Sequence, residues 1–423
     1  MSWDETRLKH LCTDSGQYGL NVPADQYRSS GTRLIRTSDI TANGELRNAH
    51  DGVFVDTVLE PRHQLRQGDI LLSRSGTLGR SLLVPAAADG HSFAGFLIRF
   101  RPSGDTEPRF LKYATQSAPF QGVVHSEAVS STIQNFNADR YANIPLRAPG
   151  TDEQRRIADF LDTEIARVDR LALARERQLA LAFARLDALA VRETGRLHVR
   201  AAGEPPADWP VRPLRRAIRG IKTGSTPSGS GPELWTDGSQ PDTLPWYGPS
   251  DFEGLLGLGV PARLLPSGAV AERVVPLFPK GSVLIVGIGA TAGKVAYLDH
   301  DASGNQQITA LTPERDVSGE FLAWQLWAAA RELRSTAPYT TLPIINNDFL
   351  KSFLIAVPSL GRQQEVARRL NRAADHVGAL RAAAVRASGL VRERRQALIT
   401  AAVTGQFDVS TAGGRNVTDG VTA

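Results

Sequence analysis

Apolar residues recur at three- and four-residue steps along two long stretches of the chain. The first stretch runs between positions 157 and 189, and no proline interrupts it before Pro205. Thr151 is a suitable N-cap residue, and two acidic residues follow it in the first turn. The pattern predicts one long amphipathic helix that begins at Thr151 and ends near Gly195. At 1.5 Å per residue this helix is about 65 Å long.

The second stretch of helical periodicity runs from position 366 to position 399. Gly378 and Gly389 fall inside it, and each costs about 1 kcal/mol of helix propensity relative to alanine. We therefore expect this helix to depend on a partner. The two apolar stripes are predicted to pack against each other as an antiparallel coiled-coil pair. The alternative is that each helix packs only on its own domain.

The remaining segments are rich in glycine, proline and serine and contain only short apolar runs. The runs at 70–72, 81–84, 96–100, 282–286 and 294–298 are typical of strands, which indicates two small mixed α/β domains. The expected order is a first domain (1–150), a first long helix (151–200), a linker (201–210), a second domain (211–358), a second long helix (359–407) and a disordered tail (408–423).

The two halves of the chain repeat each other. Identical residues recur at an offset of 209 positions, and the pairs are Thr132 and Thr341, Asn137 and Asn346, Asp139 and Asp348, Pro149 and Pro358, Gln154 and Gln363, and Ala158 and Ala367. Further upstream, Gly76 corresponds to Gly289 at an offset of 213. Repetition of half a chain predicts two similar domains in an internal pseudo-two-fold repeat. Such a protein suits a partner that itself has two like parts.

The overall composition is that of an ordinary globular protein. The chain has 423 residues, of which 41% are hydrophobic and 22% charged. No apolar run approaches the ~20 residues that a membrane-spanning helix needs, and the first residues lack a signal-peptide pattern. We therefore expect a cytoplasmic protein without a membrane partner.

No residue pattern predicts a cofactor or a metal site. Cys12 is the only cysteine, which excludes an intrachain disulfide bond and a cysteine-based zinc site. The eight histidines form no HxxxH or HExxH pair.

The basic residues are strongly biased towards arginine. Six of the 49 basic residues are lysine, so 43 are arginine, and the formal net charge is +5. Arginine makes bidentate contacts to phosphate and guanine, which favours a nucleic-acid partner. A GC-rich coding sequence produces the same bias, so composition alone leaves both explanations open.

Residues 287–294 partly match a phosphate-binding loop. Ile288 stands where that loop requires glycine, and Val295 stands where it requires serine or threonine. The first half has a comparable turn at 75–80, so the shared feature is a glycine turn followed by a cation, Arg80 or Lys294. Such a turn favours contact with phosphate or base edges over catalysis.

Motifs for nuclease and methyltransferase chemistry are incomplete. Asp242 follows a proline, as in some nucleases, but no Glu-x-Lys follows it. Residues 204–207 lack the polar and aromatic residues that flank the Pro-Pro pair of adenine methyltransferases. We assign no catalytic residue, and the duplicated chain is predicted to recognise a partner and not to act as an enzyme.

The junctions between domains and helices carry a family resemblance. They read Ile144-Pro145-Leu146-Arg147-Ala148-Pro149-Gly150-Thr151-Asp152-Glu153-Gln154-Arg155-Arg156-Ile157-Ala158 and Ile355-Ala356-Val357-Pro358-Ser359-Leu360-Gly361-Arg362-Gln363-Gln364-Glu365-Val366-Ala367. With the strand-and-turn segments 68–76 and 281–285 and the helix end 394–405, these junctions resemble the specificity subunit of type I DNA restriction and modification systems. Arg362 departs from the family pattern, which usually has glutamate there.

The resemblance implies two target-recognition domains, each reading one half of a split DNA site, and two long helices that act as a spacer. It implies that the chain is non-catalytic and binds double-stranded DNA together with methyltransferase subunits, of which two are expected, and restriction subunits. The methylating partner is expected to flip an adenine out of the duplex. The alternatives are a stand-alone DNA methyltransferase or nuclease with an unrecognised site, and a dimeric scaffold that does not bind DNA.

The candidate DNA-contacting residues lie on the shared turns and loops and on a run of amides suited to adenine. They are Arg74, Ser75, Thr77, Arg80, Ser131, Thr132, Thr291, Lys294, Asn305, Gln306, Gln307, Tyr339, Thr340 and Thr341. Positions shared by the halves are expected to maintain the fold or touch phosphate, while positions that differ set the sequence read. We expect Arg80 and Lys294 to contact phosphate. The six shared residues Gly76, Gly289, Asn137, Asn346, Asp139 and Asp348 are interpreted as turn and capping residues.

Overall fold

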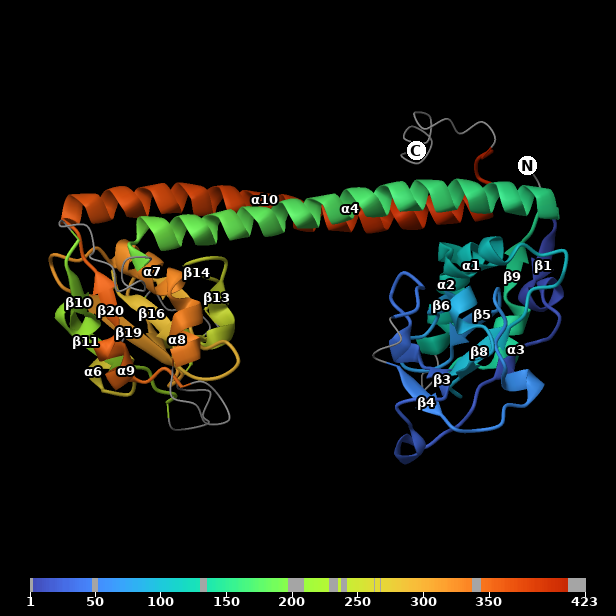
Figure 1. Cartoon of the computed structure of the whole chain (residues 1–423), viewed down its shortest axis with the longest axis horizontal. Coiled ribbons are helices and arrows are strands. Elements are labelled where there is room, and N and C mark those ends of the chain that lie inside the picture. The colour runs from blue at the N-terminus through green and yellow to red at the C-terminus, as the bar shows by residue number, and fades with distance from the viewer. Residues whose placement is uncertain are drawn as a thin grey trace. The chain divides into compact units, whose positions relative to one another are not determined.

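The computed structural model describes residues 3–47, 52–129, 135–196, 209–227, 235–236, 242–261, 263–266, 268–336 and 344–409. The chain divides into two compact units. Unit 1 comprises Met1–Ala174 and Arg386–Ala423, and unit 2 comprises Arg175–Val385. Unit 1 is therefore built from both ends of the chain, whereas unit 2 is one continuous segment. Figure 1 labels many of the elements of each unit.

Unit 1 is a mixed α/β domain with two small sheets. One has the order β2-β8-β5-β6 and the other β4-β3-β7, while β1 pairs with β9. The strands are β1 (Glu5–Arg7), β2 (Gln17–Tyr18), β3 (Thr32–Ile35), β4 (Val53–Val55), β5 (Ile70–Ser73), β6 (Ser81–Leu83), β7 (Ser92–Phe93), β8 (Leu97–Phe100) and β9 (Pro145–Arg147). The helices of the domain are α1 (Pro108–Gln116), α2 (Ala118–Val129) and α3 (Ala138–Asn143).

The central strand β5 is buried on both faces, which explains its continuous apolar sequence. Ile70 and Leu72 belong to one core cluster, and Leu71 belongs to another, because successive side chains of a strand point to opposite faces. The first cluster also contains Ile157 and Ile399 from the two long helices. The strands predicted at 70–72, 81–84 and 96–100 are confirmed.

Unit 2 repeats this topology. Its main sheet has the order β11-β19-β16-β17, its second sheet has the order β15-β12-β18, and β10 pairs with β20. The strands are β10 (Val211–Pro213), β11 (Ile218–Thr223), β12 (Thr243–Tyr247), β13 (Phe252–Glu253), β14 (Gly257–Leu258), β15 (Arg263–Pro266), β16 (Val283–Val286), β17 (Val295–Tyr297), β18 (Ser303–Gly304), β19 (Ile308–Pro313) and β20 (Leu354–Ala356). The helices are α6 (Gly268–Ala271), α7 (Gly319–Ala328), α8 (Ala330–Thr336) and α9 (Asn347–Ser352). The internal repeat is confirmed at the level of strand order.

The two long helices are α4 (Thr151–Glu193) and α10 (Leu360–Val403). Each contributes one part to each unit, so their pairing is seen twice. In unit 1, Arg395 on α10 forms an ion pair with Asp169 on α4 at 3.0 Å. In unit 2, Arg369 on α10 forms one with Glu193 on α4 at 3.3 Å. The later residue of α4 pairs with the earlier residue of α10, so the pairing is antiparallel, as predicted.

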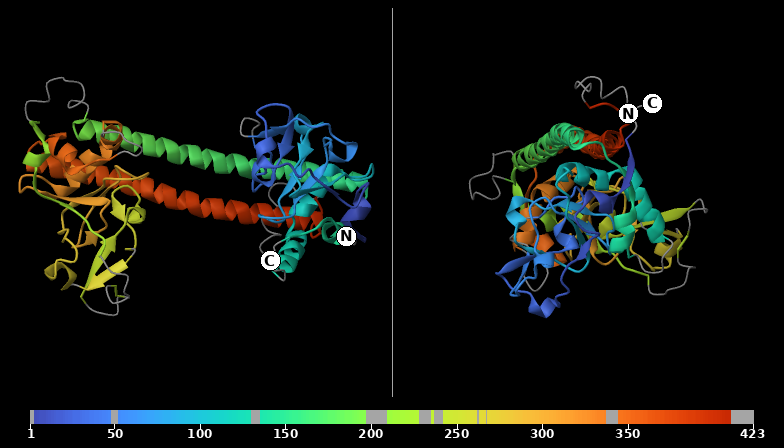
Figure 2. Two further views of the ribbon diagram at one scale, coloured as in Figure 1. Left: turned by 90° about the horizontal axis from the view of Figure 1, so that it is seen from below. Right: turned by 90° about the vertical axis from the view of Figure 1, so that its right-hand side faces the viewer.

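Both helices also pack on the domain of each unit (Figure 2). In unit 1, the Thr400 hydroxyl on α10 accepts a hydrogen bond from the backbone of Ala118 at 3.0 Å. In unit 2, Trp324 on α7 donates to Asn371 on α10 at 2.8 Å. Packing on the domain, which the sequence left as an alternative, therefore accompanies the helix pairing.

The ends of the helices lie close to their predicted positions. The first helix begins at Thr151 and ends at Glu193, two residues before Gly195, whose φ of +73° is in the left-handed region. Residues 197–208, most of the predicted linker, and 410–423, most of the predicted tail, lie outside the described residues. Trp209, at the end of the predicted linker, is buried and packs against Phe321 with ring centroids 6.2 Å apart.

Candidate nucleic-acid interface

A glycine turn connects β5 to β6 in unit 1. Gly76 and Gly79 have φ angles of +73° and +74°, which only glycine adopts without strain. The Tyr141 hydroxyl is hydrogen-bonded to both ends of the turn: it accepts from the Gly79 backbone at 3.2 Å and donates to the Ser73 carbonyl at 2.8 Å. The turn therefore presents its outer residues on a rigid base.

The equivalent turn in unit 2 connects β16 to β17. Gly289 and Gly293 have φ angles of +102° and +86°, and the Gly293 backbone donates to the Val286 carbonyl at 2.8 Å. The interpretation of Gly76 and Gly289 as turn residues is confirmed. Leu350 occupies the position of Tyr141 at the 209-residue offset, so the tyrosine that bonds to Gly79 has no counterpart at that position in unit 2.

The cation after each turn reaches the same place in the two units. Arg80 Nη1 donates to the Ile40 carbonyl at 2.6 Å, and Lys294 Nζ donates to the Phe252 carbonyl at 3.3 Å. Each carbonyl belongs to the residue directly after a short 3-10 helix. Arg80 is half-buried, whereas Lys294 is exposed. The two cations thus anchor the turn, and Lys294 also has direct access to solvent.

A second loop lies beside each glycine turn. In unit 1 the loop 94–96 connects β7 to β8, and the Phe96 carbonyl accepts from the Arg74 backbone at 2.9 Å. In unit 2 the loop 305–307 connects β18 to β19, and the Gln307 carbonyl accepts from the Gly287 backbone at 2.7 Å. The structure therefore brings together two segments that are about 20 residues apart in each half.

A third segment passes close to the second loop. A Cβ atom at Gly19 would lie 2.3 Å from the Phe93 carbonyl oxygen, and one at Gly224 would lie 2.1 Å from the Gly304 carbonyl oxygen. Real Cβ atoms do not approach so closely, so both positions require glycine. The backbone after each glycine then runs along the same loop in the two units.

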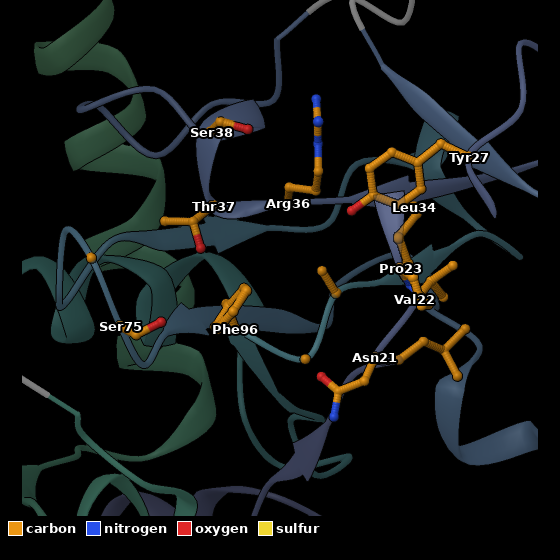
Figure 3. Close-up of a pocket in the computed structure, with 14 residues that line it drawn as sticks. Asn21, Val22, Pro23, Tyr27, Leu34, Arg36, Thr37, Ser38, Ser75 and Phe96 are labelled. Carbon is orange, nitrogen blue, oxygen red and sulfur yellow. The ribbon is translucent and has the colours of Figure 1, made fainter. Parts of the chain in front are cut away.

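These three segments of unit 1 surround a cavity of about 560 Å³ (Figure 3). Ser75 and Thr37 lie beside Phe96, and Tyr27 and the segment 21–23 lie across the cavity from them. The lining residues are Leu20, Asn21, Val22, Pro23, Tyr27, Leu34, Arg36, Thr37, Ser38, Ser75, Gly76, Ala94, Gly95 and Phe96. Arg36 is the one charged residue among them, and none is acidic, so the cavity suits a neutral or anionic ligand.

The predicted residues on the unit 1 turn have distinct surroundings. The Arg74 guanidinium lies over the Tyr18 ring, 4.6 Å from its centroid, and its Nε donates to Asn135 at 3.2 Å. Ser75 lines the cavity, and Thr77 is exposed at the tip of the turn. The structure therefore places Arg74 and Ser75 next to Phe96. Phe96 was not among the residues predicted to contact DNA.

The predicted amides of unit 2 differ in their exposure and in the hydrogen bonds that they form within the unit. Asn305 Nδ2 donates to Gln307 Oε1 at 3.1 Å, and the Gln307 backbone donates to Asn305 Oδ1 at 2.9 Å. Gln306 is exposed and accepts from the Thr226 hydroxyl at 2.6 Å. Thr291 is half-buried within the neighbouring glycine turn. Gln306 is therefore the most outward of the three amides.

Five predicted residues lie outside the described residues: Ser131, Thr132, Tyr339, Thr340 and Thr341. The described residues that follow them are informative. Asn135 forms a β-bridge with Ser75, and Ile344 forms one with Ile288. In both units the chain therefore emerges from this shared loop directly beside the glycine turn.

The shared polar residues cap short helices. Asn137 accepts from the Arg140 backbone at 2.9 Å at the start of α3, and Asn346 accepts from the Phe349 backbone at 2.8 Å at the start of α9. Asp139 and Asp348 lie in the first turns of the same helices, where a negative charge is favourable. The interpretation of Asn137 and Asn346 as capping residues is confirmed, whereas the two aspartates are first-turn residues.

Gln154 and Gln363 have a structural role that the sequence did not reveal. Both side chains are almost completely buried. Gln154 Oε1 accepts from the Glu107 backbone at 2.9 Å, and Gln363 Oε1 accepts from the Ser318 backbone at 2.8 Å. Glu107 and Ser318 are the N-cap residues of α1 and α7. Each glutamine thus fixes a domain helix to a long helix.

The described residues contain no group of three or more histidine, cysteine or acidic side chains arranged to hold a metal ion. Burial raises the pKa of the Cys12 thiol to about 12, so this side chain stays protonated at neutral pH and is a poor nucleophile. In the same described part of the chain, we find no helix with the length and apolar character needed to span a membrane.

The family model for the type I restriction modification DNA specificity domain matches residues 3–179 and 208–377. The chain belongs to this family. The two matched segments cover most of the sequence and correspond to the two halves of the internal repeat. The resemblance expected from the junction motifs is therefore confirmed.

One curated relative is similar in sequence to part of this specificity-domain protein. The type I restriction enzyme StySPI specificity subunit from Salmonella potsdam is 26% identical over 170 residues, which are 39% of this chain and 35% of that protein. The match thus spans about a third of the length of this curated relative.

Two solved structures share the fold of this specificity-domain protein. A chain from work on complex assembly and conformational transition of the type I R-M system has a TM-score of 0.73 at 19% identity, covering 96% of this chain and 98% of that one. The HsdS subunit from Thermoanaerobacter tengcongensis has a TM-score of 0.53 at 19% identity, covering 96% and 97%. The predicted fold class is confirmed.

Proposed function

We propose that this protein is the DNA-recognition subunit of a type I restriction-modification complex. In this proposal each unit reads one half of a bipartite site in double-stranded DNA. One observation carries the proposal: both units assemble the same three segments on the same strand order, yet these segments present different side chains. A repeated frame with differing outer residues is what independent readout of two unlike half-sites requires.

The proposed contacts fall into two classes. Arg80 and Lys294 contact phosphate, because a cation follows the glycine turn in both units and phosphate contacts do not depend on sequence. Arg74 corresponds to Gly287 in unit 2 and therefore belongs with the residues that contact base edges. The polar residues on the same segments contact base edges or sugars; they are Ser75, Thr77, Thr291, Asn305, Gln306 and Gln307, together with Ser131, Thr132, Tyr339, Thr340 and Thr341.

The subunit itself is non-catalytic in this proposal. Methyl transfer belongs to methyltransferase subunits, of which we propose two, and cleavage belongs to restriction subunits. Family membership supports this division, as does the solved relative that was studied for the assembly of a type I R-M system. The complex would act on DNA in the cytoplasm.

Purified chain incubated with S-adenosylmethionine and mixed duplex DNA tests the division of labour. We expect sequence-specific DNA binding without methyl transfer, and methyl transfer only after a methyltransferase subunit is added. Methylation by the chain alone would contradict the proposal and favour a stand-alone enzyme.

A further inference from the structure

The loop 94–96 of unit 1 and the loop 305–307 of unit 2 occupy equivalent places. The backbones of Gly19 and Leu20 donate to the carbonyls of Leu97 and Phe93 in unit 1. In unit 2 the backbones of Gly224 and Ser225 donate to the carbonyls of Ile308 and Gly304. The acceptors of unit 2 lie 211 positions after those of unit 1. The three residues between them therefore correspond as Ala94 to Asn305, Gly95 to Gln306 and Phe96 to Gln307. Because the backbone frame is the same, the side chains are what distinguish the two loops.

Phe96 is the side chain that the unit 1 loop presents to its surroundings. It is 63% exposed, whereas Ala94 is 8% exposed. A Cβ at Gly95 would lie 2.0 Å from Asn21 Oδ1, so that position accepts no side chain without a shift. Phe96 belongs to none of the core clusters formed by the described residues, and it lines the cavity beside Ser75 and Thr37 (Figure 3).

The charges around this apolar ring suit a polyanion. The Arg74 backbone N–H donates a hydrogen bond to the Phe96 carbonyl, and the Arg74 guanidinium lies over the Tyr18 ring. Arg36 lies on the cavity wall, 6.0 Å above the centre of the Tyr27 ring, but its guanidinium is paired with the buried Asp39 carboxylate at 3.1 Å, so Arg74 is the cation that carries this argument. An apolar partner protein or a lipid tail gains nothing from the Arg74 cation, whereas DNA offers phosphates next to base edges.

We propose that Phe96 is a specificity-determining residue that contacts the 5-methyl group of a thymine in the half-site read by unit 1. A phenyl ring has no conventional hydrogen-bond donor or acceptor, and the thymine methyl is the apolar group that base pairs expose in the major groove. Unit 2 has an amide, Gln307, at the equivalent position and does not share this preference. The inference rests on the proposed DNA-recognition function and adds the chemistry of one contact.

The test begins with the full-length chain and a pool of randomised DNA duplexes, from which the bound sequence is selected. Each thymine of the selected site is then replaced singly by deoxyuridine, which lacks only the methyl group. We expect one replacement in the unit 1 half-site to weaken binding about fourfold, the effect of burying one methyl group. In Phe96→Ala the same replacement should have no effect.

Two variants serve as controls. Val58→Ala truncates another apolar side chain of unit 1, which is 98% exposed and does not line the cavity, and should keep the wild-type response to deoxyuridine. Phe96→Leu keeps an apolar group and should retain part of the response. Circular dichroism should show that all three variants keep the wild-type fold, because neither side chain is buried.

The outcomes separate the inference from the proposed function. Failure to enrich any duplex would overturn both. Enrichment of a site whose unit 1 half lacks thymine would overturn the inference alone, and so would a deoxyuridine effect that persists unchanged in Phe96→Ala. Which half belongs to unit 1 is assigned independently of Phe96, as the half that changes when residues 1–150 are exchanged for the matching region of a relative.

Discussion

Gln154 and Gln363 show that residues repeated in the two halves can stabilise the fold by binding backbone groups. Each amide is buried and joins the N-cap of a domain helix to the proline carbonyl before a long helix, Pro149 or Pro358, at 2.8 Å. A side chain with one donor group and one acceptor at fixed spacing is needed for this bridge. The residues that are identical in the two halves therefore indicate a shared fold more than a shared DNA sequence.

Gln363→Ala should lower the free energy of unfolding of unit 2 by about 2 to 4 kcal/mol, because it removes hydrogen bonds and leaves the Ser318 N–H buried without its acceptor. Guanidinium denaturation followed by tryptophan fluorescence measures this effect, since Trp324 lies in unit 2. Gln178→Ala, at an exposed position of α4, is the matched control. Equal stability of the two variants would show that the bridge contributes little.

Lys294→Ala should weaken binding to all duplexes alike and reduce the slope of log affinity against log salt by about one. The reason is that Lys294 is exposed and held beside the turn by a single carbonyl contact. Binding to selected and scrambled duplexes at several salt concentrations gives the slope. Loss of affinity for the selected duplex only, with an unchanged slope, would mean that Lys294 reads a base.

Arg80→Ala should have the same effect on the salt slope and in addition destabilise unit 1. Arg80 is half-buried, and its guanidinium donates to the carbonyls of Ile40 and Thr37. Loss of such charged hydrogen bonds costs about 1.5–3 kcal/mol. Thermal unfolding measured beside the salt titration separates the two effects, and an unchanged slope would limit Arg80 to its anchoring role.

At the scale of elements, the long helices were predictable and the interface loops were not. Periodicity over some forty residues averages out local exceptions, so Thr151 and Gly195 bracketed α4 closely. The loop 94–96 has no such signal, because its place depends on the Gly19 segment and on the turn after β5, which are distant from it in sequence. The sequence held one clue to the equivalence of the two loops. The halves are offset by 213 positions at Gly76 and by 209 positions at Thr132, and the offset of 211 between Phe96 and Gln307 lies between these values.

The helix pair offers a test of the spacer role, and the structure indicates where to make the change. An insertion near Ala188 would fall inside the packed core of unit 2, where Leu186 and Ala190 are buried. The boundaries between units, after Ala174 in α4 and after Val385 in α10, avoid this core.

Four residues inserted at each boundary should extend both helices by about 6 Å and lengthen the unspecified spacer of the DNA site by about two base pairs. Both half-sites should stay the same, because neither domain is altered. Sequencing of the methylated sites in cells that carry the lengthened subunit measures the spacer. An unchanged spacer would mean that the helix pair does not set this distance.

For the whole molecule, the two units predict modular recognition. Exchanging residues 1–150 for the matching region of a relative should change one half-site and leave the other unchanged, because the second domain lies entirely within unit 2. Methylation sequencing reads both halves in one experiment. A simultaneous change of both halves would contradict independent readout. The graft should keep the contacts of α1 and α2 with α10, such as Gln396 to the Gln116 carbonyl at 2.9 Å.

The division of unit 1 between the two ends of the chain also bears on how the protein is made. The core of unit 1 includes Leu398, Ile399 and Ala402, which leave the ribosome only after all of unit 2 has been synthesised. At about 5–20 residues per second, the first domain waits about 13 to 50 s for these side chains. Unit 2 is continuous and can complete its core first. Nascent chains should thus mature in the reverse of their sequence order, with the opening domain exposed to chaperones and proteases until translation is nearly finished.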